Sequence, residues 1–391
     1  MGGAVSGRFF GEVDAAFEPV REAFAENFSA GRETGAALCV YVDGRCVVDL
    51  WGGVADSASG RPWERDTLQL VFSTTKGATA LCAQLLAARG ILDLDAPVAS
   101  VWPEFAEAGK EGVTVRHLLR HEAGLAWVDR PLSLDEVLAW DPVVRALESQ
   151  RPAWQPGTRH GYHAVTFGHL VGEVVRRLDG RSLGRFFAEE VAAPLGLDFW
   201  IGLPASEHHR VALLESPEVP FDDPAVAAVV EQVLGPDTPL GKALFMGGAF
   251  GAGRFDTFNL PEVWSAEIPA ANGICDARSL AKMYAACVSE VDGLRLLDDG
   301  HVDEIVSDRT EGPDAVLFEM DMQHAGGFMV PTGFVKLGGP RSFGHYGAGG
   351  SVGFADPDAR VGFGYVMNRM FVGLTGDPRT QTLIDAVYEC L

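Results

Sequence analysis

A serine and a lysine three residues apart offer the clearest chemistry in this chain. Ser73-Thr74-Thr75-Lys76 is an S-x-x-K motif, and the residues after it, up to Gly90, have the apolar spacing of a helix. Ser73 and Lys76 are therefore predicted to lie one turn apart on one face of the helix start. A serine hydroxyl becomes a good nucleophile when a nearby base takes its proton. A lysine can be that base if burial or neighbouring positive charge lowers its pKa.

A second serine motif competes with the first. Residues 349–353 fit G-x-S-x-G around Ser351, the pattern of the nucleophile turn in α/β-hydrolases. That fold needs an acidic residue and then a histidine after the serine, but the last histidine here, His345, precedes Ser351. A strand-like run, not a helix, follows Ser351. We therefore interpret residues 349–353 not as a nucleophile turn but as glycines that let a strand pass close to substrate.

Other motifs predict neither a metal nor a cofactor. His117 and His121 lie four apart, but H-E-x-x-H is absent and no third ligand is evident, so structural histidines are expected. His208-His209 is expected in a surface loop. The glycine cluster at 247–253 lacks the spacing of a dinucleotide-binding turn, and no clear strand precedes it.

Charge and targeting signals narrow the partners and the compartment. The chain of 391 residues has a formal net charge of -23, and such a surface repels nucleic acids and anionic membranes. Residues 1–20 lack a secretory signal, and no apolar run could span a bilayer. Met1-Gly2 with Ser6 matches a myristoylation pattern only loosely. Cytoplasmic residence is therefore expected, with no nucleic-acid or membrane partner.

Six cysteines are scattered along the chain without a C-x-x-C pair. Several of them sit within apolar runs. They are predicted to be free, buried thiols in a reducing compartment. Neither a zinc site nor a disulfide framework is indicated.

The elements that must position Ser73 and Lys76 come from both ends of the chain. Two β-rich runs within 36–51 flank Asp43-Gly44, a type I′ hairpin signal. The middle, from about 77 to 290, shows mainly helical signals, including a helix at 165–178 that stops at Gly180. The other expected elements are helices at 9–30 and 378–390, strands at 342–346, 351–355 and 361–368, and an irregular stretch at 235–273.

This order predicts an α+β architecture in which both termini build one antiparallel sheet flanked by helices. The sheet domain would comprise residues 1–85 and 275–391, and a mainly helical domain would be inserted at 86–274. A cleft between two such domains is a common place for an active site.

Longer segments carry a family resemblance. LVFSTTKGATALCAQLLAARGILDLDAPVASVWPEF, around Ser73, resembles the active-site region of class C β-lactamases and their esterase relatives. The next segment of the family resembles TVRHLLRHEAGL here. The family's segment with the catalytic tyrosine resembles WQPGTRHGYHAVTFGHL, and its Lys-Thr-Gly strand resembles GHYGAGGSVGFADP. The chain is most similar to family VIII carboxylesterases, which implies a β-lactamase-like fold.

The resemblance also implies roles for particular residues. Ser73 would attack the carbonyl, and Lys76 and Tyr162 would form a proton relay. The backbone N–H groups of Ser73 and Ala348 would form the oxyanion hole. His345 and Gly347 would line the substrate pocket.

Two departures from the family pattern argue against β-lactam turnover. Tyr162-His163-Ala164 stands where Tyr-x-Asn is common, and His345 replaces the lysine of Lys-Thr-Gly. The expected activity is hydrolysis of small, uncharged carboxylic esters without a cofactor. The alternatives are a β-lactamase or D-amino-acid peptidase, an acyltransferase, and a binding module that has kept only the fold.

Overall fold

A large antiparallel sheet built from both ends of the chain dominates the computed structural model, which describes residues 9–217, 223–251, 255–373 and 375–391. Its strands follow the order β1-β3-β2-β12-β11-β10-β9-β8, and β4 pairs with β3. The strand bounds are β1 Phe9–Val13, β2 Gly35–Val42, β3 Arg45–Asp56, β4 Arg61–Pro62, β8 Gln323–Ala325, β9 Phe328–Val330, β10 Phe343–Tyr346, β11 Val352–Asp356 and β12 Val361–Met367.

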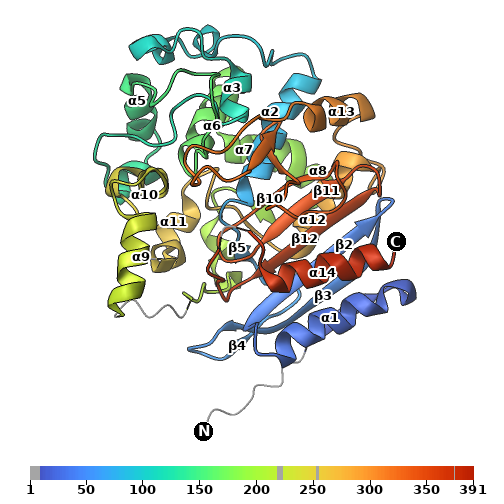
Figure 1. Ribbon diagram of the computed structural model, residues 1–391. Coiled ribbons are helices and arrows are strands. Elements are labelled where there is room, and N and C mark those ends of the chain that lie inside the picture. The colour runs from blue at the N-terminus through green and yellow to red at the C-terminus, as the bar shows by residue number, and fades with distance from the viewer. Residues whose placement is uncertain (1–8, 218–222, 252–254, 374) are drawn as a thin grey trace.

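Helices cover both faces of this sheet (Figure 1). Helix α12 (Ala277–Val288) packs on β2, β11 and β12, while α1 (Glu18–Ser29) and α14 (Pro378–Glu389) lie side by side on the other face. Glycines bring α12 close to the strands, because a Cβ on Gly362 would lie 2.4 Å from the Ala285 nitrogen. Strand β2 pairs with β12, which confirms the predicted pairing of N-terminal and C-terminal strands.

The middle of the chain forms a helical region and a small sheet. The sheet has the order β5-β7-β6, from Gln69–Leu70, Ile274–Cys275 and Phe199–Trp200. The helices are α2 Thr75–Ala88, α3 Val115–Leu119, α4 Leu134–Leu138, α5 Asp141–Ser149, α6 Thr166–Asp179, α7 Leu183–Phe187, α8 Ala193–Leu195, α9 Pro224–Leu234, α10 Pro239–Phe245, α11 Pro261–Ser265 and α13 Asp299–Ser307.

Most local predictions match these elements. Asp43 and Gly44 both have positive φ, as a type I′ hairpin requires, and Gly180 ends α6 in the left-handed conformation. The stretch at 235–273, expected to be irregular, instead contains α10 and α11, each preceded by a residue with extended backbone and begun by a proline.

The predicted helix at 9–30 is wrong in its first third. Residues Phe9–Val13 form β1, which pairs with the edge of β3, and only Glu18–Ser29 is α-helical. Phe9 and Val13 fit both periods, since positions four apart also share a strand face. Gly11 favours the strand, because its φ of 115° is not helical and its lack of a Cβ allows close pairing with β3, where a Cβ would lie 1.9 Å from the Asp49 oxygen.

The described residues contain no helix long and apolar enough to cross a membrane. The loose myristoylation pattern at Met1, Gly2 and Ser6 lies outside the described residues, as does part of the glycine cluster, at 252–254. Cytoplasmic residence and the division at 85 and 275 stay predictions.

Candidate active site

Ser73 lies in a tight turn between β5 and α2. Its predecessor, Phe72, has a φ of 44°, which is rare for a bulky residue and marks local backbone strain. Helix α2 begins at Thr75, so Lys76 lies in its first turn. The Lys76 Nζ is 2.9 Å from the Ser73 Oγ, as the S-x-x-K spacing predicts.

Lys76 is fully buried and held by two backbone carbonyls. Its Nζ donates to the Ala164 oxygen at 2.6 Å and the Ala270 oxygen at 3.0 Å. Burial lowers the pKa of Lys76 well below its usual range. A neutral amine can donate its two N–H groups to these two carbonyls and accept the Ser73 hydroxyl proton with its lone pair.

Tyr162 also contacts the Ser73 Oγ. Its hydroxyl donates to the Ser73 Oγ at 2.7 Å, and the Lys76 Nζ lies 4.8 Å from the centre of its ring. Burial raises the pKa of Tyr162, while the hydrogen bond to Ser73 lowers it by a smaller amount. The phenol therefore keeps its proton at neutral pH and can donate it.

The backbone around Tyr162 has no regular secondary structure, and buried side chains hold it in place. The Tyr162 N–H donates to the Asp314 Oδ1 at 3.1 Å, and the His163 N–H donates to the His121 Nδ1 at 2.9 Å. The same Asp314 oxygen accepts the N–H groups of Val316 and Leu317. Sequence reasoning missed Asp314, since an aspartate after Gly-Pro reads as an ordinary turn residue.

Removing the acceptor at Asp314 should destabilise the protein and misplace Tyr162. Asp314→Ala leaves three backbone N–H groups without this partner, and we expect the free energy of unfolding to fall by about 2–5 kcal/mol. Asp314→Asn retains an Oδ1 acceptor and serves as the matched control. Urea unfolding checks the prediction, and equal stability of the two variants would contradict it.

Imidazole rings surround the rest of Tyr162. The ring centres of His121, His324 and His345 lie 5.5, 6.0 and 6.0 Å from that of Tyr162. Burial lowers the pKa of all three histidines, that of His345 to about 3, so the rings are neutral. The described residues contain no group of His, Cys, Asp and Glu side chains able to hold a metal ion.

His345 lies on β10 and presents one unpartnered nitrogen. Its Nδ1 donates to the Tyr346 oxygen at 2.6 Å, and its Nε2 has no hydrogen-bond partner among the described residues. His163, at the middle of the altered tyrosine motif, instead donates from Nδ1 to the Gly161 oxygen and accepts the Leu125 N–H at Nε2. It therefore fixes the local backbone.

The segment after β10 passes against the Ser73 turn. A Cβ on Gly347 would lie 2.1 Å from the Val71 oxygen, so the close approach requires glycine. Within the described ranges, the backbone N–H groups of Ser73 and Ala348 have no hydrogen-bond acceptor. Two such free donors are what an oxyanion hole needs.

The competing serine holds this junction together. Ser351 is fully buried, donates to the Val71 oxygen at 2.9 Å and lies 3.1 Å from the Thr74 Oγ1.

The structure also places the other histidines singled out in the sequence. His117 caps α3 through Thr114, and His121 lies after that helix with positive φ. His208 packs its ring on Trp264, partly buried, while His209 is exposed.

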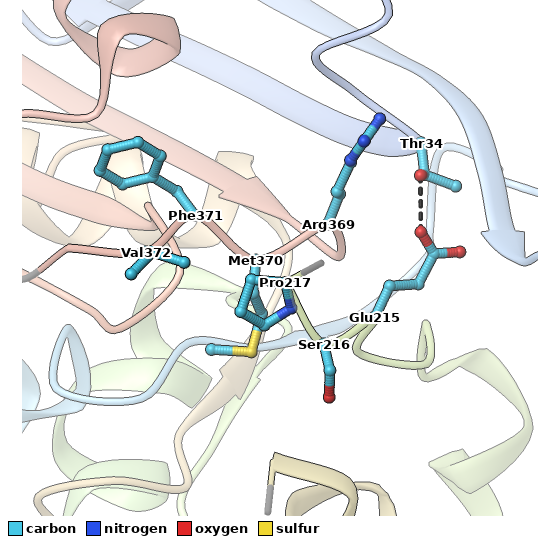
Figure 2. A pocket seen from close by; sticks show the side chains of 8 residues that line it. All are labelled: Thr34, Glu215, Ser216, Pro217, Arg369, Met370, Phe371 and Val372. Carbon is cyan, nitrogen blue, oxygen red and sulfur yellow. Dashed lines mark hydrogen bonds between the residues drawn. The ribbon is translucent and has the colours of Figure 1, made fainter. Parts of the chain in front are cut away.

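A cavity of about 460 Å³ lies next to the same junction (Figure 2). Met370 and Phe371 form part of its wall, and the Phe371 N–H donates to the Gly349 oxygen. The described lining contains none of the predicted site residues, and Glu215 bonds to Thr34 inside it. The cavity is therefore a neighbour of the candidate site, joined to it through Gly349.

Comparisons with known proteins agree with this fold. The β-lactamase family model matches residues 20–386, and the chain belongs to this family. It is 38% identical to "Esterase/beta-lactamase LipL" of Mycobacterium tuberculosis, over 93% of this chain and 83% of LipL.

Two solved structures resemble the whole chain. A family VIII carboxylesterase has 39% identity and a TM-score of 0.87, covering 98% of this chain and 100% of its own. A penicillin-binding protein homologue from Caulobacter crescentus has 37% identity and a TM-score of 0.86, with the same coverage. The β-lactamase-like fold is confirmed, and the chain is a serine hydrolase.

Proposed function

We propose that this protein is a carboxylesterase that hydrolyses small, uncharged esters through an acyl-enzyme on Ser73. One observation carries the proposal: the Ser73 Oγ lies between the Lys76 Nζ at 2.9 Å and the Tyr162 hydroxyl at 2.7 Å. A nucleophile flanked by a neutral amine and a protonated phenol has both a base and an acid in contact with it.

Acylation follows from these contacts. Neutral Lys76 takes the Ser73 proton as the Oγ attacks the ester carbonyl, and the oxyanion meets the N–H groups of Ser73 and Ala348. Tyr162 then protonates the departing alkoxide, and Lys76 returns its proton to the tyrosine. In the second half, Lys76 and Tyr162 take a proton from water as the water oxygen attacks the acyl carbon. The pair then returns that proton to the Ser73 Oγ as the carbon–oxygen bond breaks and the acid leaves.

The charge of the site supports neutral substrates. With its pKa lowered to about 3, His345 carries no charge at neutral pH and cannot hold a substrate carboxylate as a lysine would.

The same catalytic residues could also act on other substrates. The name of LipL couples esterase with β-lactamase, so β-lactam hydrolysis is the second candidate. Initial rates on p-nitrophenyl acetate and butyrate, set against a chromogenic cephalosporin, test the choice. We expect efficient ester turnover and weak or no cephalosporin turnover, and equal rates would contradict the substrate proposal while leaving Ser73 in place. Adding alcohols or amines to the acylated enzyme would detect acyl transfer.

Exchanging the histidine for a lysine should shift substrate preference. In His345→Lys, an ammonium can bond to a carboxylate, and we expect the ratio of kcat/KM for carboxylate-bearing over neutral substrates to rise about tenfold or more. His345→Gln, which stays neutral, is the matched control and should leave the ratio near that of the wild type. An unchanged ratio in His345→Lys would place His345 away from the substrate.

A further inference from the structure

Two cysteines on neighbouring strands form a thiol pair outside the candidate active site. Cys39 lies on β2 and Cys46 on β3, and their Sγ atoms are 3.7 Å apart. They are separated in sequence by the Asp43-Gly44 hairpin.

A β-bulge brings these two side chains to one face of the sheet. Cys39 pairs with Asp49 and Val40 with Val48, but the next partner of Tyr41 is Cys46, so Val47 is the extra residue. In an unbroken ladder Cys46 would face the opposite side, because a shift of one residue reverses side-chain direction. The bulge therefore creates the pair, and the sequence spacing alone does not reveal it.

The two thiols have different surroundings. Cys39 is fully buried, whereas Cys46 is half-buried and lines a groove of about 410 Å³ with Asp49, Trp51 and Arg65. The hydrogen bond from the Cys39 thiol lowers the pKa of Cys46, while burial raises the pKa of Cys39. Cys46 is thus the thiol that ionises more readily and that a solute can reach.

We propose that Cys46 and Cys39 form a reversible disulfide by exchange with a low-molecular-weight disulfide that enters at Cys46. The groove beside Cys46 has the volume of a small-molecule site. Bonding requires the Sγ atoms to approach by roughly 1.7 Å more, to a separation of about 2.05 Å.

The exchange balances in two displacements. The Cys46 thiolate attacks one sulfur of the small disulfide, and the first small thiolate leaves with the bonding electrons. Cys39 then loses its proton and attacks the Cys46 Sγ, and the second small thiolate leaves. The protein loses two electrons and two protons, and the small disulfide becomes two thiols.

The remaining thiols provide controls. Burial raises the pKa of Cys82, Cys275 and Cys287, and all three are buried. Cys390 is half-buried like Cys46, but burial raises its pKa, and its Sγ bonds to the Ala386 oxygen with no thiol beside it among the described residues. It is the matched control for exposure.

The test uses the full-length folded protein and oxidised glutathione, followed by trypsin and mass spectrometry. Trypsin cuts after Arg45, so only a disulfide can hold a peptide containing Cys39 to one containing Cys46. We expect this linked pair, lighter by two hydrogens than the two separate peptides, and its complete loss on reduction. Wild-type protein without it after equilibration with excess oxidant would overturn the proposal.

Variants assign the order of attack. Cys46→Ser should abolish the reaction, and Cys39→Ser should accumulate one glutathione on Cys46, because the second displacement is missing. Cys390→Ser should react as the wild type does. Glutathione found mainly on Cys390, or a Cys39→Ser protein that takes up none, would contradict the proposed roles.

Discussion

The Ser73→Ala variant should lose ester hydrolysis by roughly 10⁴-fold or more and fail to react with a fluorophosphonate probe. The Ser73 Oγ is the oxygen that contacts both Lys76 and Tyr162, and alanine removes the attacking atom while leaving both partners. Peptide mass spectrometry of the labelled wild type should place the adduct on Ser73.

Ser351 provides the control for this experiment. Its hydroxyl is buried and bonded to the Val71 oxygen, so it has a supporting role at the junction between β11 and the Ser73 turn. Ser351→Ala should keep the label on Ser73 and much of the activity, with some loss of stability. An adduct on Ser351 in the wild type would remove Ser73 from the mechanism.

Lys76→Ala and Tyr162→Phe should each lower kcat by about 10²–10⁴-fold, the range for a general acid or base. If the two groups act as one relay, the double variant should lose little more than either single variant. Steady-state kinetics on a p-nitrophenyl ester measures all three. A Tyr162→Phe enzyme with near-wild-type kcat would exclude the tyrosine from proton transfer.

Lys76→Arg separates a base from a mere positive charge. Arginine carries a fixed positive charge and N–H donors but does not deprotonate, so this variant should be as inactive as Lys76→Ala. The wild type should lose activity as pH falls through the pKa of Lys76, since protonation removes the base. Because burial lowers the pKa of Lys76, the activity should rise with pH and reach its plateau before the pH reaches about 10, the ordinary pKa of a lysine.

The elements that were predictable are those encoded by local chemistry. Asp43-Gly44 predicts its hairpin because both positions need positive φ, and Ser73 and Lys76 meet because a helix start fixes their geometry. Tyr162 was assigned through the family resemblance, and the structure places its hydroxyl on the Ser73 Oγ.

What sequence reasoning missed depends on contacts between distant segments. Asp314 supports the Tyr162 backbone from 152 positions away, and nothing in its neighbourhood predicts that. The prediction of buried thiols is wrong for Cys46 and Cys390, which are half-buried, because Cys46 lies at a bulge and Cys390 follows the last helix. The bulge has no sequence signal of its own.

The pairing of β2 with β12 has a consequence for biosynthesis. Seven residue pairs, from Ala36 with Met367 to Val42 with Val361, join strands more than 300 residues apart in the chain. At about 5–20 residues per second, a ribosome needs roughly 15–60 s between making the two strands. Throughout that time the nascent β2 edge has no partner and can pair with another nascent chain. Translation that stops before β12 should therefore yield aggregating fragments, and a chaperone that shields this edge would raise the yield of full-length enzyme.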